Sequence, residues 1–306
     1  AGSYIVFLAQ PQRRNVLALF EPQTYPNRLT PSGEAERPYD VAGWTLPMQL
    51  GVDAPAVLAI REPDSERKLM LLTDANEVRA DLALPLKKSD ESPIKNPIKQ
   101  NVRIGIYKGA TGNMDEGWTR YVFDTFNVPY TSIRDAEIKS GNLQAKYDVL
   151  ILPSQRSRNN ADTESNQSDS ARGFGEQGTA SMIAFVKEGG NLICFDGSCE
   201  TVIKQFNLPV KNVLEGLKSS EFYCPGSILS LELDSTNQIN ATLPSTLSAY
   251  FNNSSAFSST DSSVRVVARY AKDNVLRSGW LLGEDKLRGQ IALAEVPVGK
   301  GRVVLF

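Results

Sequence analysis

The spacing of apolar residues changes character near residue 100 of this 306-residue chain. In the first hundred residues prolines recur, and only helical turns at 12–20 and short strands at 56–60 and 68–73 are predicted. Residues 87–100 are polar and broken by proline, as expected of an exposed linker. We therefore predict that residues 1–100 form an irregular connector rather than an autonomous domain.

Beyond residue 101 the apolar segments become regular. Apolar runs predict strands at 102–107, 130–133, 147–152 and 191–195, separated by helices at 115–127 and around 182–188. In the first of these helices Trp118, Val122 and Phe126 recur at i, i+4 and i+8, which predicts one apolar face packed in the core. The order strand, helix, strand, strand, helix, strand is that of an α/β domain with a mostly parallel, doubly wound sheet.

The chain ends in a β-rich part. Strands are predicted at 227–233, 264–270 and 291–306, the last folded into a hairpin at 297–301. One long polar loop, residues 154–177, follows a central strand at the edge where open α/β sheets bind ligands. This loop is either a functional lid or a plain surface loop.

Composition excludes several classes of chemistry. The chain contains no histidine, so Ser-His-Asp, Cys-His and histidine-ligated zinc sites cannot be assembled within it. No acidic cluster has metal-loop spacing, and we expect no metal and no cofactor in this chain. The net charge of -2 and the absence of a basic block argue against nucleic-acid or membrane-surface binding. No apolar run reaches the ~18 residues that a membrane helix requires.

One segment has the context of a nucleophile elbow. Residues 195–200 (FDGSCE) follow a buried strand and precede a predicted helix, where Cys199 would have a lowered pKa. No histidine is present to act as its base, and the glycine spacing is not G-x-S-x-G. The alternative is an ordinary turn in which Asp196 or Ser198 caps the helix.

Other candidates for binding are single residues. Asp115 and Glu116 lie where a helix N-terminus favours negative charge. Arg134, like Arg120 and Arg156, could meet an anionic ligand or simply be solvated or paired. Aromatic side chains could serve as stacking platforms for a carbohydrate: Trp118, Tyr121 or Trp280.

Several long blocks resemble one family. The segments LFEPQTYP (19–26), YDVAGWTLP (39–47), MDEGWTR (114–120), EFYCPGS (221–227) and SGWLLGE (278–284) are similar to the region that follows the catalytic domain in bacterial carboxypeptidase A-like zinc peptidases. From about Val102 onward the chain resembles the flavodoxin-like fold of class I glutamine amidotransferases, including its closing strand GKGRVVLF (299–306). The Cys-His-Glu triad of those enzymes is not recognisable, which implies a non-catalytic relative.

The resemblance implies an accessory region of a larger protein. The family's zinc ligands, an H-x-x-E pair and a distal histidine, lie upstream of the matched region, so zinc belongs to the parent and no catalytic residue is carried over. The expected partners are the upstream peptidase domain and a peptide or glycan substrate, in a periplasmic or secreted protein. Residues 101–306 would form the amidotransferase-like domain, truncated after Phe306. The alternatives are a Cys199-dependent hydrolase or amidotransferase, and a carbohydrate-binding module.

Overall fold

A computed structural model describes residues 11, 13–21, 24–25, 27–36, 102–109, 113–154, 174–241, 243–252 and 254–306. The predicted strands at 56–60 and 68–73, the linker at 87–100 and most of the loop at 154–177 lie outside these residues. The helices are α1 (Arg13–Phe20), α4 (Met114–Thr125), α5 (Asp135–Ser140), α6 (Gly175–Lys187) and α7 (Gly197–Phe206).

Five strands form a parallel half-sheet. In space they run in the order β2, β1, β3, β4, β12, and every neighbouring pair is parallel. This is the flavodoxin-type order, whose direction of winding reverses between β1 and β3. The prediction of an α/β domain with a mostly parallel sheet is confirmed. The strands are β1 (Ile104–Tyr107), β2 (Thr131–Ile133), β3 (Val149–Leu152), β4 (Asn191–Cys194) and β12 (Gly301–Leu305).

The same sheet continues as an antiparallel half. The chain turns at Gly299 from β11 into β12, and this hairpin joins the two halves. The path then runs from β11 to β9, β6 and β10, with β7 paired to β6 and β8 paired to β11 and β5. The predicted β-rich C-terminal part and its hairpin are confirmed. The strands are β5 (Lys211–Asn212), β6 (Ser227–Leu233), β7 (Thr246–Phe251), β8 (Phe257–Ser258), β9 (Arg265–Tyr270), β10 (Leu276–Ser278) and β11 (Ile291–Val298).

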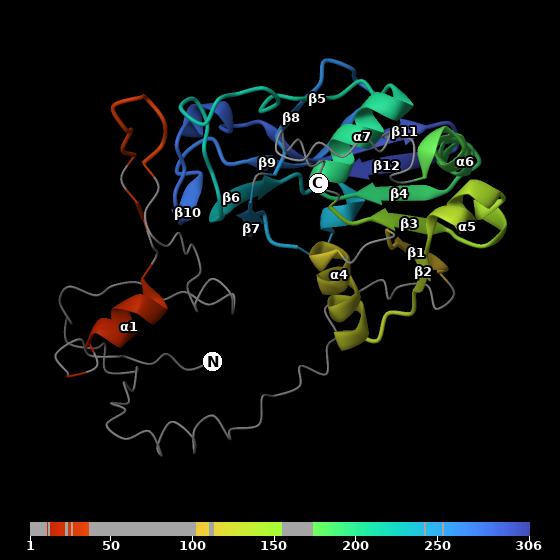
Figure 1. Ribbon diagram of the computed structural model, residues 1–306, viewed down its shortest axis with the longest axis horizontal. Helices are drawn as coiled ribbons and strands as arrows, with labels where there is room; N and C mark the ends of the chain where they lie inside the picture. Colours follow the sequence, from red (N-terminus) through yellow and green to blue (C-terminus); the bar gives the residue numbers. More distant parts are fainter. Residues whose placement is uncertain are drawn as a thin grey trace, which may run out of the picture.

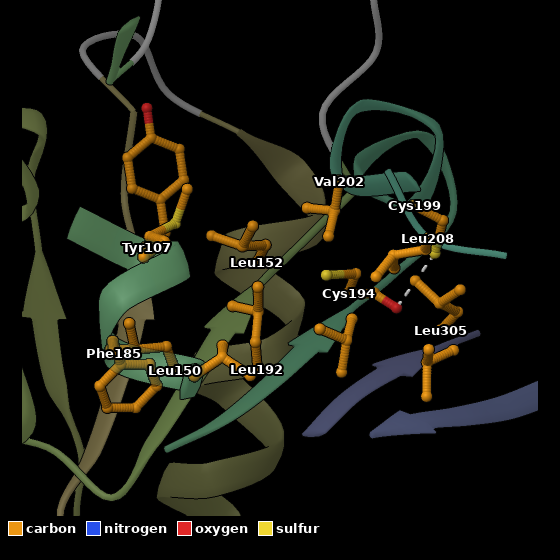
Figure 2. Close-up of a cluster of buried hydrophobic side chains, with 14 of the residues drawn as sticks. Tyr107, Leu150, Leu152, Phe185, Leu192, Cys194, Cys199, Val202, Leu208 and Leu305 are labelled. Carbon is orange, nitrogen blue, oxygen red and sulfur yellow. Dashed lines mark hydrogen bonds between the residues drawn. The ribbon is translucent and has the colours of Figure 1, made fainter. Parts of the chain in front are cut away.

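Helices cover the parallel half unequally. The helices α5, α6 and α7 lie over one face, whereas α4 lies against the other (Figure 1). Right-handed crossovers require this arrangement, because the strands are added in opposite directions on the two sides of β1. A buried cluster fills the space under α6 and α7, where Leu150, Leu192 and Leu305 of neighbouring strands meet Phe185 and Val202 (Figure 2). Apolar surface buried here supplies the main stabilisation of this half.

The apolar stripe predicted on α4 does not face the sheet. Trp118 is 61% exposed and Phe126 is 73% exposed, so the prediction that they pack in the core is wrong. Glu116 is the buried side chain of this helix, and it lies about 200° around the axis from Trp118 at 100° per residue. Periodicity identified the helix correctly but assigned the wrong face to the core.

Part of the N-terminal segment contacts the antiparallel half. Thr24 forms a parallel bridge with Gly279, and the Trp280 indole Nε1 donates a hydrogen bond of 2.8 Å to Asn27 Oδ1. Trp280 is fully buried, and its ring packs edge-on against Tyr223. The interpretation of Trp280 as a ligand-stacking platform is therefore wrong, because this side chain is buried and bonds to Asn27 instead.

Candidate functional site

The turn between β4 and α7 has an aspartate at its apex. Ser198 N–H donates a hydrogen bond of 3.1 Å to the Phe195 carbonyl, which closes a four-residue turn. The first central residue, Asp196, has φ 43° and ψ -118°, and these are the angles of a type II′ turn, where glycine is preferred. The Asp196 N–H is held by the Phe306 carbonyl at 2.7 Å. A strained strand-to-helix turn of this kind is the geometry of a nucleophile elbow.

The two residues singled out within this turn point into the protein. Ser198 Oγ donates to the Pro153 carbonyl at 2.6 Å, and Cys199 Sγ contacts the Cys194 carbonyl at 3.3 Å (Figure 2). Cys199 is fully buried, and burial raises its pKa. The expectation of a lowered pKa is wrong, since loss of water outweighs the favourable field of the helix N-terminus. Asp196 occupies the N-cap position, but its side chain makes no capping hydrogen bond.

A cavity of about 240 Å³ opens beside this turn. It lies where the parallel and antiparallel halves meet, between the first turns of α4, the carboxyl ends of β3 and β4, and strands β6, β7 and β9. Ligands of open α/β sheets bind at this edge. The lining residues are Asp115, Trp118, Thr119, Ser154, Phe195, Asp196, Leu231, Ala249, Tyr250, Phe251, Ser254, Tyr270 and Phe306.

Aromatic side chains form much of the cavity wall. Trp118 packs edge-on against Tyr121, with ring centroids 5.7 Å apart, and remains mostly exposed. Tyr250, from β7, is 45% exposed, while Phe195 and Phe306 pack edge-on at 6.3 Å. Exposed aromatic rings beside a cavity are suited to stacking on a ligand. Of the proposed platforms, Trp118 lines the cavity, and Tyr121 supports it from outside.

Asn113 fixes the position of α4 at the cavity. Its side-chain oxygen accepts hydrogen bonds from the amides of Asp115 and Glu116, at 2.8 and 3.2 Å, and so caps the helix. Its Nδ2 donates to the Ser154 carbonyl at 2.7 Å and ties α4 to the end of β3. Asn113 thus holds the first turn of α4 across the switch point between β1 and β3.

The charged candidates divide into two groups. Among the described residues that line the cavity, the charged ones are Asp115 and Asp196. Glu116 is buried and forms an ion pair of 2.6 Å with Arg120 Nε, although the two groups are not aligned as a hydrogen bond. Arg134 is the N-cap residue of α5 and is not part of the lining. The structure therefore brings Asp115 and Trp118 together with Asp196, and leaves Glu116, Arg134, Ser198 and Cys199 out.

Sequence reasoning missed most of the aromatic wall. Tyr250 and Phe251 lie on β7, which the apolar pattern did not predict, and Phe306 ends the chain. Within the described residues no three histidine, cysteine, aspartate or glutamate side chains gather as metal ligands would. Among the helices of the described part, none has the length and apolarity that a bilayer crossing requires.

No family model and no curated protein matches the chain. Solved structures with a similar arrangement include a putative ThuA-like protein from Bacteroides uniformis (12% identity, TM-score 0.40, 69% of this chain and 83% of that one). Others are a glutamine amidotransferase from Thermotoga maritima (11%, 0.39, 66% and 74%) and a β-galactosidase from Bacillus circulans (13%, 0.41, 67% and 28%). At TM-scores near 0.4 these likenesses concern the architecture and carry no inference about ligand or reaction.

Proposed function

We propose that this chain is a non-catalytic recognition region whose cavity binds one ring of a carbohydrate. The observation that carries the proposal is Trp118, which is 61% exposed beside a cavity that carboxylates and hydroxyl groups also line. An exposed tryptophan offers a flat apolar surface to the C–H face of a sugar ring. Asp115, Thr119 and Ser154 lie close enough to the same space to accept or donate hydrogen bonds to sugar hydroxyls.

The size of the cavity supports a small ligand. A volume of about 240 Å³ is below the ~300 Å³ at which typical small-molecule pockets begin. One monosaccharide unit, free or at the end of a glycan, is the scale of ligand that such a space accommodates. A longer chain would extend past Trp118 over the exposed side of α4.

The state of the thiols argues against amidotransferase chemistry in this cavity. A cysteine nucleophile must present a thiolate to its substrate, but Cys199 is buried and is not part of the lining. The apex of the elbow carries Asp196, and the chain supplies no histidine base. The lack of a thiolate and a base favours binding over covalent catalysis as the role of the cavity.

Calorimetric titration of the full chain with monosaccharides tests the proposal. We expect at least one pyranose to bind, and Trp118→Ala to weaken that binding about tenfold, since an aromatic contact contributes ~0.5–2 kcal/mol. Phe126→Ala is the matched control, because Phe126, the C-cap residue of α4, is also an exposed aromatic and does not line the cavity. Failure of every sugar to bind, or equal binding by the Trp118 variant, would overturn the proposal.

We further propose that this recognition region serves a zinc carboxypeptidase-like parent. The resemblance of segments such as MDEGWTR (114–120) and SGWLLGE (278–284) supports this assignment. In such a parent the zinc site and the hydrolysis would reside in an upstream domain, in a periplasmic or secreted protein. Mass spectrometry of the native polypeptide tests it: an upstream histidine-bearing domain supports the assignment, and a natural start at Ala1 overturns it.

A further inference from the structure

We infer that Asn113 is a positioning residue for the sugar site, which holds Trp118 over the cavity by tying α4 to the end of β3. The inference rests on the proposed function and adds to it a residue that is not itself part of the cavity lining. Three features support it: the way α4 is attached to the sheet, the hydrogen bonds of one side chain, and the chemistry of asparagine.

The helix α4 is attached to the sheet with little apolar packing. A surface helix normally buries an apolar stripe against its domain, but the stripe of α4 faces away, and Glu116 is the buried side chain of this helix. At the C-terminal end, Phe123 packs edge-on against Tyr130, with ring centroids 5.8 Å apart, and the Tyr130 hydroxyl donates a hydrogen bond of 3.1 Å to Asp124. At the N-terminal end, beside the cavity, Asn113 makes the hydrogen bond to the end of β3.

Two walls of the cavity are joined through this one side chain. Asn113 Oδ1 caps α4 by accepting hydrogen bonds from the amides of Asp115 and Glu116, and its Nδ2 donates to the Ser154 carbonyl at 2.7 Å. Asp115, on α4, and Ser154, just beyond β3, both line the cavity. Trp118 follows the capped turn on the same helix, so a change in the distance between Asn113 and Ser154 moves its ring relative to the rest of the cavity.

The Ser154 end of this hydrogen bond is itself fixed. Ser154 is buried, and the preceding carbonyl, that of Pro153, accepts a hydrogen bond of 2.6 Å from Ser198 Oγ in the first turn of α7. Adjacent carbonyls at the end of β3 are thus bound by side chains at the starts of two different helices. Since Ser154 is held in place by its neighbours, its bond to Asn113 restrains α4 rather than following it.

Asparagine combines the two kinds of polar group that this position uses. Asparagine and aspartate cap helices about equally well, but only the amide has N–H groups to donate. Replacing Asn113 by aspartate therefore keeps the cap, removes the bond to Ser154 and sets a carboxylate against its carbonyl oxygen. α4 then populates positions displaced from β3, and the apparent affinity for a sugar falls with the fraction of molecules in which Trp118 is in place.

The experiment is a calorimetric titration of the full chain with D-glucose, D-galactose and D-mannose, repeated on variants with the sugar that binds most tightly. We expect Asn113→Asp to weaken binding about fivefold, the order of effect of one hydrogen bond. Asn113→Ser, which keeps a capping oxygen and lacks the amide, should weaken it similarly. The matched control is Asn237→Asp, because Asn237 caps Gln238–Asn240 through a hydrogen bond of 2.9 Å from the Ile239 amide and does not line the cavity.

The control should bind as the unsubstituted chain does. Thermal unfolding establishes that each variant is folded at the temperature of the titration. Binding is then measured on folded molecules alone, so a contribution of Asn113 to stability without an effect on the position of α4 would leave the affinity unchanged.

A double-mutant cycle with Trp118→Ala tests whether Asn113 acts through Trp118. We expect Asn113→Asp to weaken binding less than about twofold when residue 118 is already alanine, because a displaced α4 then has no ring to misplace. Unchanged affinity in Asn113→Asp and Asn113→Ser, or the same loss with and without Trp118, would overturn the positioning role and leave the proposed function standing. Failure of every sugar to bind the unsubstituted chain would overturn both.

Discussion

Asp196 has φ 43° and ψ -118°, backbone angles that a residue with a Cβ atom adopts only under strain. The strained backbone costs of order 1–3 kcal/mol, and this cost is avoidable, because glycine adopts the same angles freely. Gly197, the next residue, shows that glycine is tolerated in this turn.

We therefore expect Asp196→Gly to be more stable than Asp196→Ala by about 1 kcal/mol. Both variants lose the carboxylate, but alanine keeps the Cβ atom that clashes at positive φ, whereas glycine relieves the strain. Part of the stability that glycine gains, ~0.5–1 kcal/mol, is lost to its greater conformational freedom in the unfolded chain. Urea unfolding of the two variants measures the difference. Equal midpoints would show that the turn is not strained.

The three cysteines provide a second test at the scale of single residues. Cys194, Cys199 and Cys224 are buried, and burial raises the pKa of each thiol, that of Cys224 to about 12. We expect the native protein at pH 8 to react with a thiol reagent such as 5,5′-dithiobis(2-nitrobenzoic acid) far more slowly than the unfolded protein. One thiol of the native chain that reacts as fast as free cysteine would contradict this expectation and revive the Cys199 enzyme hypothesis.

At the scale of elements, two helices respond oppositely to the same substitution. Gly117, within α4, has open space where a Cβ would be, whereas at Gly178, within α6, an added Cβ would lie 2.4 Å from Phe174 Cβ. We expect Gly117→Ala to stabilise the protein by up to ~1 kcal/mol through helix propensity. Gly178→Ala gains the same propensity but must displace Phe174, and overpacking typically costs ~1–3 kcal/mol.

Thermal or urea unfolding of these two glycine variants measures both effects, and each variant serves as the control for the other. Destabilisation by Gly117→Ala would mean that α4 packs more closely on its neighbours than the structure describes. A neutral Gly178→Ala would mean that the start of α6 adjusts easily around Phe174.

The elements themselves were largely predictable, but their faces were not. β3 and β4 lie within the predicted runs at 147–152 and 191–195, because a strand buried on both sides is continuously apolar. α4 was also predicted, yet its apolar stripe faces away from the sheet, since periodicity defines a stripe without stating what covers it. Glu116, a charged residue, is buried through its ion pair with Arg120, which no pattern of hydropathy reveals.

The site was predictable only in part, for a related reason. Asp115 and Trp118 were singled out from their place on one helix, but Tyr250 comes from a strand over a hundred residues away, and only the fold brings them together. The elbow was recognised from its strand-to-helix context. Residue type did not reveal the backbone angles that put Asp196 at the apex of the turn and direct Cys199 inward.

At the scale of the whole molecule, the two halves of the sheet share a dependence on pH. Burial raises the pKa of Cys194 and Cys199 in the parallel half, and of Cys224 and Tyr270 in the antiparallel half. In the unfolded chain cysteine titrates near 8.5 and tyrosine near 10. Above these values the native state retains protons that the unfolded state releases, so the free energy of unfolding must fall as the pH rises.

We expect each buried thiol to lower the free energy of unfolding by about 1.4 kcal/mol per pH unit above about 8.5, and Tyr270 to steepen the decline above about 10. Urea unfolding at intervals from pH 7 to 10.5 measures the slope. Cys199→Ala is the informative variant: it should begin less stable, because it leaves a small cavity, but lose stability less steeply by one thiol's share. If the free energy of unfolding stayed level from pH 8.5 to 10, the thiols would be accessible to water in the native state. The turn that holds Cys199 would then be open to the cysteine chemistry that its burial argues against.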